Sequence, residues 1–70
     1  MTLDDVKLWL WQLFHAGSVY EELLLDHMSG RMPMPQQDYY IRSYRLRRKC
    51  LGSARKAFDL TVLEIEKELE

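Results

Sequence analysis

Six basic side chains recur in the second half of this chain, and their spacing suggests binding chemistry more clearly than that of any other residues. The sequence has no acid between Tyr39 and Phe58. Residues three or four positions apart share a face of a helix, so one helix would carry a basic stripe made of Arg42, Arg45, Arg48, Lys49, Arg55 and Lys56. Such a stripe could bind phosphates of DNA or RNA, dock on an acidic protein surface, or serve only as a solvated face.

Arg47 differs from these six because it interrupts an apolar stripe of the same predicted helix. A buried guanidinium without a partner is strongly unfavourable, so Arg47 must either extend its head group to water or pair with an acid. Glu21 is the candidate partner. One interpretation is a structural ion pair, and the other is a polar residue that sets the register of helix pairing.

Leu8 and Trp11 form a second candidate binding feature. Both are expected on the side of the first helix that faces away from Leu13 and Leu24. Tryptophan is enriched at the centres of protein interfaces. The pair would therefore either anchor another protein or pack inside a homodimer, and both interpretations require cover from a second chain.

Two helices must position these residues. An apolar stripe with alternating steps of four and three predicts a helix over about residues 35–69, and it comprises Tyr40, Tyr44, Arg47, Leu51, Ala54, Phe58, Thr61 and Ile65. Thr2 and Asp5 form a capping-box variant that opens a helix over about residues 3–29. A proline-containing connector of about residues 30–34 joins the two. Gly17–Ser18 leaves two alternatives open: a continuous or kinked first helix, or a break that gives a three-helix variant.

The expected fold is all-α, an antiparallel helical hairpin that dimerises into a helical bundle. Matching positions outward from the connector places Arg47 opposite Gly17, where a missing side chain leaves room for the long arginine. The same matching leaves Ile65 and Leu69 beyond the end of the first helix. Their exposure would be unfavourable, so we expect a second copy of the chain to cover them.

Composition narrows the classes of function. The chain has 70 residues, a formal net charge of −1 and one cysteine, Cys50, which bounds it to a single domain without an internal disulfide or a zinc-finger framework. No secretory signal or membrane-spanning stretch is recognisable, so we expect a cytoplasmic protein. No nucleophile pair or phosphate-binding loop is present either, so we expect neither an enzyme nor any cofactor, metal or small-molecule substrate.

These observations predict a non-enzymatic protein–protein interaction module that acts as a homodimer and binds and regulates another protein. The alternative is a nucleic-acid-binding regulator that uses the basic residues of the long helix. A third class, a purely structural component of an assembly, would form oligomers larger than a dimer.

Overall fold

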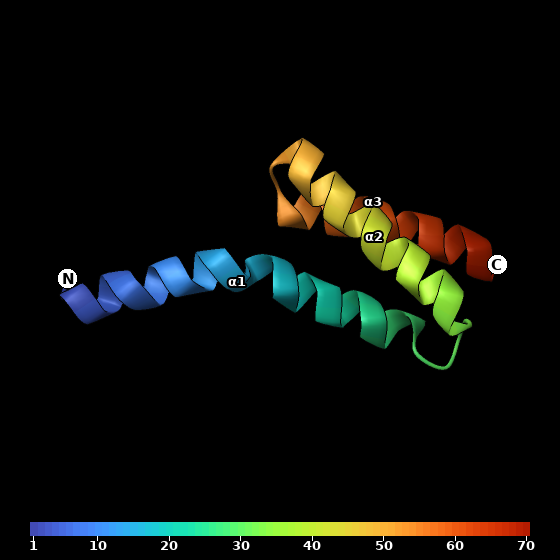
Figure 1. Ribbon diagram of the computed structural model, residues 1–70, viewed down its shortest axis with the longest axis horizontal. Helices are drawn as coiled ribbons and strands as arrows, with labels where there is room; N and C mark the ends of the chain where they lie inside the picture. The colour runs from blue at the N-terminus through green and yellow to red at the C-terminus, as the bar shows by residue number, and fades with distance from the viewer.

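The protein is all-helical in its computed structural model, with three α-helices in the order α1 (Leu3–Met28), α2 (Met34–Leu51) and α3 (Ala54–Leu69) (Figure 1). The structure describes the backbone of the whole chain and all side chains except those of residues 9–16. The all-α class expected from the sequence is therefore confirmed, and the described chain contains no strand.

Helix α1 begins with the capping box that the sequence suggested. The Asp5 amide donates to Thr2 Oγ1 over 3.3 Å, and the Thr2 amide donates to Asp5 Oδ2 over 3.0 Å. These bonds satisfy amides that have no partner inside the helix, and the bond from the Thr2 backbone lowers the pKa of Asp5. The helix then continues through Gly17 to Met28, so the chain adopts the continuous alternative and does not break at Gly17–Ser18.

The single long helix expected over residues 35–69 is wrong, because the chain turns at Gly52–Ser53. Gly52 adopts a left-handed conformation with φ of 67°, and its amide donates to the Arg48 carbonyl over 3.0 Å. Ser53 caps the next helix by accepting from the Lys56 amide over 3.3 Å. Glycine after a helix and serine before one are ordinary stop and start signals. The apolar stripe nevertheless favoured a continuous helix, because its periodicity continues unchanged across the turn.

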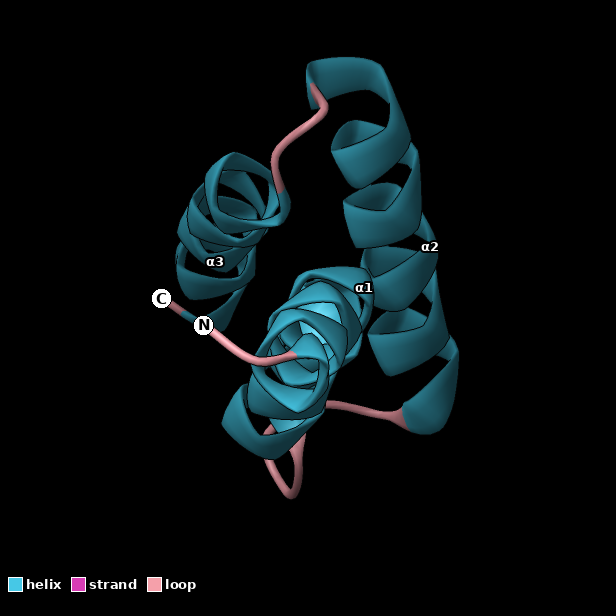
Figure 2. Ribbon diagram, turned by 90° about the vertical axis from the view of Figure 1, so that its left-hand side faces the viewer, coloured by secondary structure: helices cyan, strands magenta, loops and turns pink.

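This turn replaces the expected two-helix hairpin with three helices that all contact one another. Helix α2 runs back along the C-terminal half of α1, and α3 reverses again beside α2 (Figure 1). Figure 2 shows α2 and α3 on either side of α1. The N-terminal half of α1 extends beyond the other two helices (Figure 1), which gives a body of 48 × 24 × 17 Å.

The core lies where the three helices meet, and each helix contributes to it. The largest fully buried side chains are Tyr44, Leu24, Met28, Ile65 and Thr61. The buried Thr61 hydroxyl donates to the Ala57 carbonyl over 2.7 Å, so it is not left without a partner.

The expectation that Ile65 and Leu69 need a second chain is wrong. Ile65 is fully buried, and Leu69 is partly buried against the same core. Both lie on α3, which the turn at Gly52 folds back onto α1 and α2. The covering surface that the sequence analysis assigned to another copy is therefore supplied by the chain itself.

We predict that Gly52→Ala lowers the free energy of unfolding by about 1 kcal/mol, because an L-residue is disfavoured in the left-handed conformation. No atom lies within 4 Å of a Cβ built at Gly52, so steric overlap adds nothing to this cost. Urea denaturation followed by circular dichroism measures the change. Lys49→Ala, at an exposed position one turn earlier, is the matched control and should leave the stability nearly unchanged. A stability gain in Gly52→Ala would contradict the turn.

Candidate protein interaction site

An arginine side chain of α2 packs against Gly17, but it is that of Arg48 and not that of Arg47. A Cβ added at Gly17 would overlap the Arg48 guanidinium, so the glycine provides the space in which this side chain lies. The Tyr44 hydroxyl donates to the Gly17 carbonyl over 3.0 Å. The Arg48 guanidinium carbon also lies 5.8 Å from the centre of the Tyr44 ring, within the range of a cation–π contact. The predicted pairing of Gly17 with Arg47 is therefore wrong, and Arg48, the next residue on α2, takes that place.

Glu21 likewise pairs with a different arginine from the expected one. Arg45 donates to both carboxylate oxygens of Glu21, over 2.7 Å and 3.3 Å. Such a two-point bond holds both side chains in one geometry. It also commits Arg45, one of the six predicted binding residues, to the contact between α1 and α2.

Arg47 faces α3 because α2 presents different sides to its two neighbours. Its guanidinium donates to Thr61 Oγ1 over 3.0 Å and forms an ion pair with Glu64. Arg47 is thus a structural ion-pair residue, one of the two roles that the sequence left open. Glu64 could not be identified as its partner from a straight long helix, in which the two residues lie far apart.

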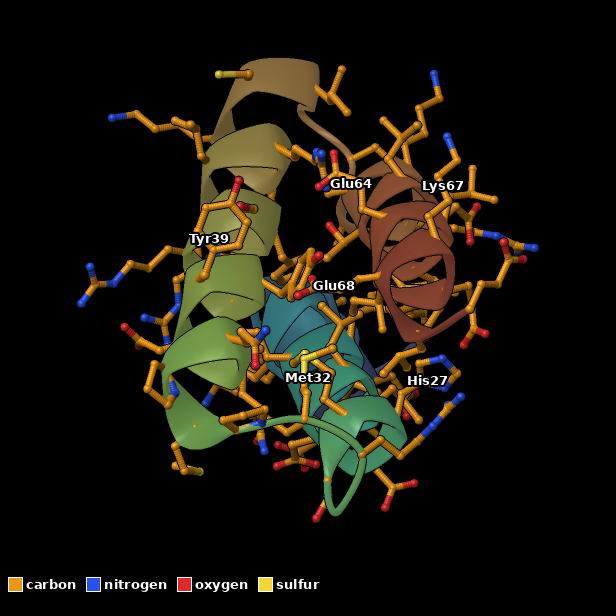
Figure 3. The ribbon with its side chains drawn as sticks, turned by 90° about the vertical axis from the view of Figure 1, so that its right-hand side faces the viewer. His27, Met32, Tyr39, Glu64, Lys67 and Glu68 are labelled. Atoms are coloured by element: carbon orange, nitrogen blue, oxygen red, sulfur yellow. The ribbon has the colours of Figure 1, made fainter. Side chains whose placement is uncertain are left out.

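The contact between α2 and α3 is lined by further polar pairs. The Tyr40 hydroxyl donates to Glu68, and the Gln36 amide donates to the same carboxylate over 2.9 Å. Figure 3 shows Glu64 and Glu68 between the two helices. The hydrogen bond to Glu68 raises the pKa of Tyr40 to about 12, since loss of the proton would place two negative charges together. Between α1 and α3, Glu66 pairs with His27 and lies 3.6 Å from Arg31.

The six bases predicted as one stripe do not form one. The turn at Gly52 places Arg55 and Lys56 on α3, away from the line of α2. Arg42 pairs with Asp38 over 2.9 Å, and Arg55 lies 4.0 Å from Asp59. Lys49 and Lys56 are exposed. Five of the six bases are thus exposed and only Arg48 is half-buried, while three of the exposed ones also pair with acids of the same chain.

The outer side of the α2–α3 pair exposes four large apolar side chains. Arg47 and Thr61 meet at the contact between α2 and α3, and we call residues at this contact seam residues. The residue after a seam residue turns towards α1: Arg48 lies against Gly17, and Val62 lies one turn after Phe58, whose ring centre is 5.1 Å from that of Tyr20 on α1. The residue before a seam residue consequently faces away from α1, since it is rotated by about 100° in the other direction. These outward residues are Tyr39, Leu46, Leu60 and Leu63, with exposed fractions of 61%, 63%, 45% and 59%.

Cations accompany these apolar residues in regular order. Arg42 and Lys49 alternate with Tyr39 and Leu46 on α2 in steps of three and four. On α3, in the same way, two lysines flank Leu60 and Leu63 at a distance of four residues. All four cations are exposed, namely Arg42, Lys49, Lys56 and Lys67. We refer to these eight residues together as the basic–apolar face. Two exposed acids border the lines: Asp38, which pairs with Arg42, and Asp59, three residues after Lys56.

The exposed side of α1 has the opposite charge. Val19 and Leu23 are 54% and 48% exposed, and Glu22 and Asp26 beside them are also exposed. These four residues, which we call the acidic–apolar face, lie opposite the buried Leu24 on the helix. Towards the N-terminus, the predicted interface residue Leu8 continues the same side and is 57% exposed. The side chain of Trp11, predicted with it, lies outside the described residues.

Known proteins give no guide to this surface, since the chain matches no family model and no curated protein or solved structure is significantly similar to it. Among the side chains that the structure describes, no group of three or more His, Cys, Asp or Glu is placed to hold a metal ion. The described parts of the helices also contain no stretch long and apolar enough to cross a membrane. The two faces are the candidate site because each exposes large apolar side chains together with charged ones.

We predict that Gly17 and Arg48 are energetically coupled. In an Arg48→Ala background, Gly17→Ala should raise the free energy of unfolding by about 1 kcal/mol, the difference in helix propensity between the two residues. With Arg48 present, Gly17→Ala should raise the free energy of unfolding by less, or should lower it, because the guanidinium must leave its position beside Tyr44. A double-mutant cycle from urea denaturation measures the coupling. An equal gain in both backgrounds would show that Arg48 does not occupy this space.

We also predict that stability falls in alkaline solution because of Tyr40. Between pH 10 and about 12 the folded chain keeps the Tyr40 proton, whereas the unfolded chain loses it at about pH 10. The unfolded state then binds fewer protons, so the stabilisation present below pH 10 is lost as the pH rises towards 12. Tyr40→Phe and Glu68→Gln should each reduce this loss in urea denaturations across the range. An unchanged pH dependence in Tyr40→Phe would contradict the hydrogen bond.

Proposed function

We propose that this chain is a small non-enzymatic protein–protein interaction module that acts as a homodimer and binds and regulates another protein. The observation that carries the proposal is the basic–apolar face, where four large apolar side chains are 45–63% exposed on one side of two packed helices. Exposed apolar residues are ordinary when scattered, but a group of them with a charged rim is typical of an interaction surface.

The geometry of α1 supports the homodimer. Its N-terminal half extends beyond α2 and α3 (Figure 1), and Leu3 and Leu8 in that half are 70% and 57% exposed. The sequence of residues 8–14, Leu-Trp-Leu-Trp-Gln-Leu-Phe, is apolar at six of its seven positions. A helix that is apolar all round is normally buried by a neighbour. A second copy of the chain can supply that cover at the predicted interface residues Leu8 and Trp11.

The use of the polar side chains supports a role in binding without catalysis. Arg45, Arg47 and Tyr40 hold the helices together through acids of the same chain. A general acid or base instead needs access to a substrate. We place the protein in the cytoplasm, where the exposed thiol of Cys50 would stay reduced.

The alternative proposal, a nucleic-acid-binding regulator, would use the cations of the same face. Lys49, Lys56 and Arg42 are exposed and belong to the predicted set. Two features weaken it: Arg45 and Arg48 are committed to α1, and leucines occupy the centre of the face, where phosphate binding would favour more cations.

An affinity-capture experiment separates the two proposals. The tagged chain and its Leu46→Ser/Leu60→Ser variant are incubated with native cell extract, with and without nuclease, and captured proteins are quantified by mass spectrometry. We expect a protein partner that survives nuclease and is lost with the variant, since serine removes apolar area from the centre of the face. Met34→Ser, at an exposed position outside the face, is the matched control and should retain the partner.

Two results would contradict the leading proposal. Loss of every captured protein after nuclease would favour the nucleic-acid alternative. Equal capture by the wild type and the Leu46→Ser/Leu60→Ser variant would exclude this face as the binding surface, provided that circular dichroism shows both chains folded.

A further inference from the structure

The two exposed faces are complementary in composition and lie on opposite sides of the molecule. The basic–apolar face belongs to α2 and α3 on the side away from α1, and the acidic–apolar face belongs to α1 on the side away from α2 and α3. Each has apolar residues that alternate with charges of one sign. The net charge of −1 thus conceals a strong separation of charge.

We infer that the basic–apolar face of one copy binds the acidic–apolar face of a second copy, so that the chain associates head to tail. This inference rests on the proposed self-association and names the surfaces that carry it. Val19 and Leu23 would lie among Leu46, Leu60 and Leu63 of the next copy. Glu22 and Asp26 would then come within reach of Lys56 and Lys67.

Charge complementarity selects the second copy as the occupant. The basic–apolar face needs an amphipathic helix that carries acids beside its apolar residues. The C-terminal half of α1 is such a helix: Glu22 and Asp26 are spaced by four residues, and residues 17–28 contain no lysine or arginine. The same steps of three and four occur on all three helices, so the rows of side chains can interleave.

The opposed direction of the faces determines the symmetry of the assembly. Two copies related by a two-fold axis would each have to offer both faces to the other at once. Faces on opposite sides of one small body cannot do this, so each pair of copies makes one such contact. A dimer formed in this way keeps one face of each kind free. Another protein with an acidic amphipathic helix would compete for the free basic–apolar face, and further copies would add as the concentration rises.

The test uses two charge-reversed variants of the full chain. Variant A, Lys56→Glu/Lys67→Glu, makes the α3 part of the basic–apolar face acidic. Variant B, Glu22→Lys/Asp26→Lys, makes both faces basic. None of the four residues is buried, and a glutamate in the first turn of α3 is favourable for the helix. Sedimentation velocity over a concentration series should show self-association of the wild type and a loss of about tenfold or more in each variant alone.

Mixing the variants is the decisive step. The acidic α3 residues of variant A now complement the basic α1 face of variant B. The unchanged α2–α3 face of variant B likewise complements the unchanged α1 face of variant A. An equimolar mixture should therefore recover association close to that of the wild type. The control variant Lys7→Glu/Arg55→Glu changes the net charge as much as variant A, but at residues outside both faces, and should associate like the wild type.

The outcomes separate this inference from the proposed function. Two results would overturn the head-to-tail contact: continued association of variants A and B each on its own, or dissociation of each variant without recovery on mixing. Either result would leave a homodimer through other residues intact. A wild type that stays monomeric at every concentration would overturn both. Recovery on mixing, together with unchanged association of the control, would establish the contact.

Discussion

The left-handed turn at Gly52 is the constraint on which the rest of this structure depends. Without it, α2 and α3 would be one helix, and Ile65 would lie far from the core that now buries it. With it, α3 returns beside α2, and one chain supplies three helices to one core. The turn costs little, because glycine adopts a positive φ readily and Ser53 caps the helix that follows.

The return of α3 also determines which charges are used inside the chain and which are exposed. Arg47 and Tyr40 face acids of α3, and Arg45 faces Glu21 of α1. These pairs link neighbouring helices across their contacts. The charges left over fall on two surfaces of opposite sign, with apolar residues among them. Paired seams and complementary outer faces are thus two consequences of the same folding back.

Much of the fold could be predicted from the sequence, and the errors have one cause. The helical class, the start of α1 at Thr2 and the connector before α2 follow from capping and proline signals that act over a few residues. The turn at Gly52–Ser53 carried signals of the same kind, but an apolar stripe that keeps its phase across the turn favoured a continuous helix. Every later error followed: Arg47 was matched to Gly17, and Ile65 was assigned to a second chain.

Less of the candidate site than of the fold could be predicted from the sequence. Exposed bases could be identified, but not which of them would be paired, because Glu64 and Glu68 meet α2 only after the turn. Leu60 and Leu63 could not be recognised as part of a binding surface, since they lie on the same side as Tyr39 and Leu46 only after α3 has folded back beside α2. A helical wheel drawn separately for residues 34–51 and 54–69 would have shown both the four apolar residues and the cations that accompany them.

The folding back of α3 is the central claim, and a distance between α2 and α3 within one chain tests it most directly. Spin labels at Tyr39→Cys and Lys67→Cys, in a Cys50→Ser background diluted with unlabelled chain, report this distance by pulsed electron resonance. A continuous helix would separate these positions by roughly 42 Å, from a rise of about 1.5 Å per residue. The folded-back chain brings the neighbouring residues Tyr40 and Glu68 into hydrogen-bond contact, so the account predicts a distance well under half that value. A distribution centred near the long distance would contradict it.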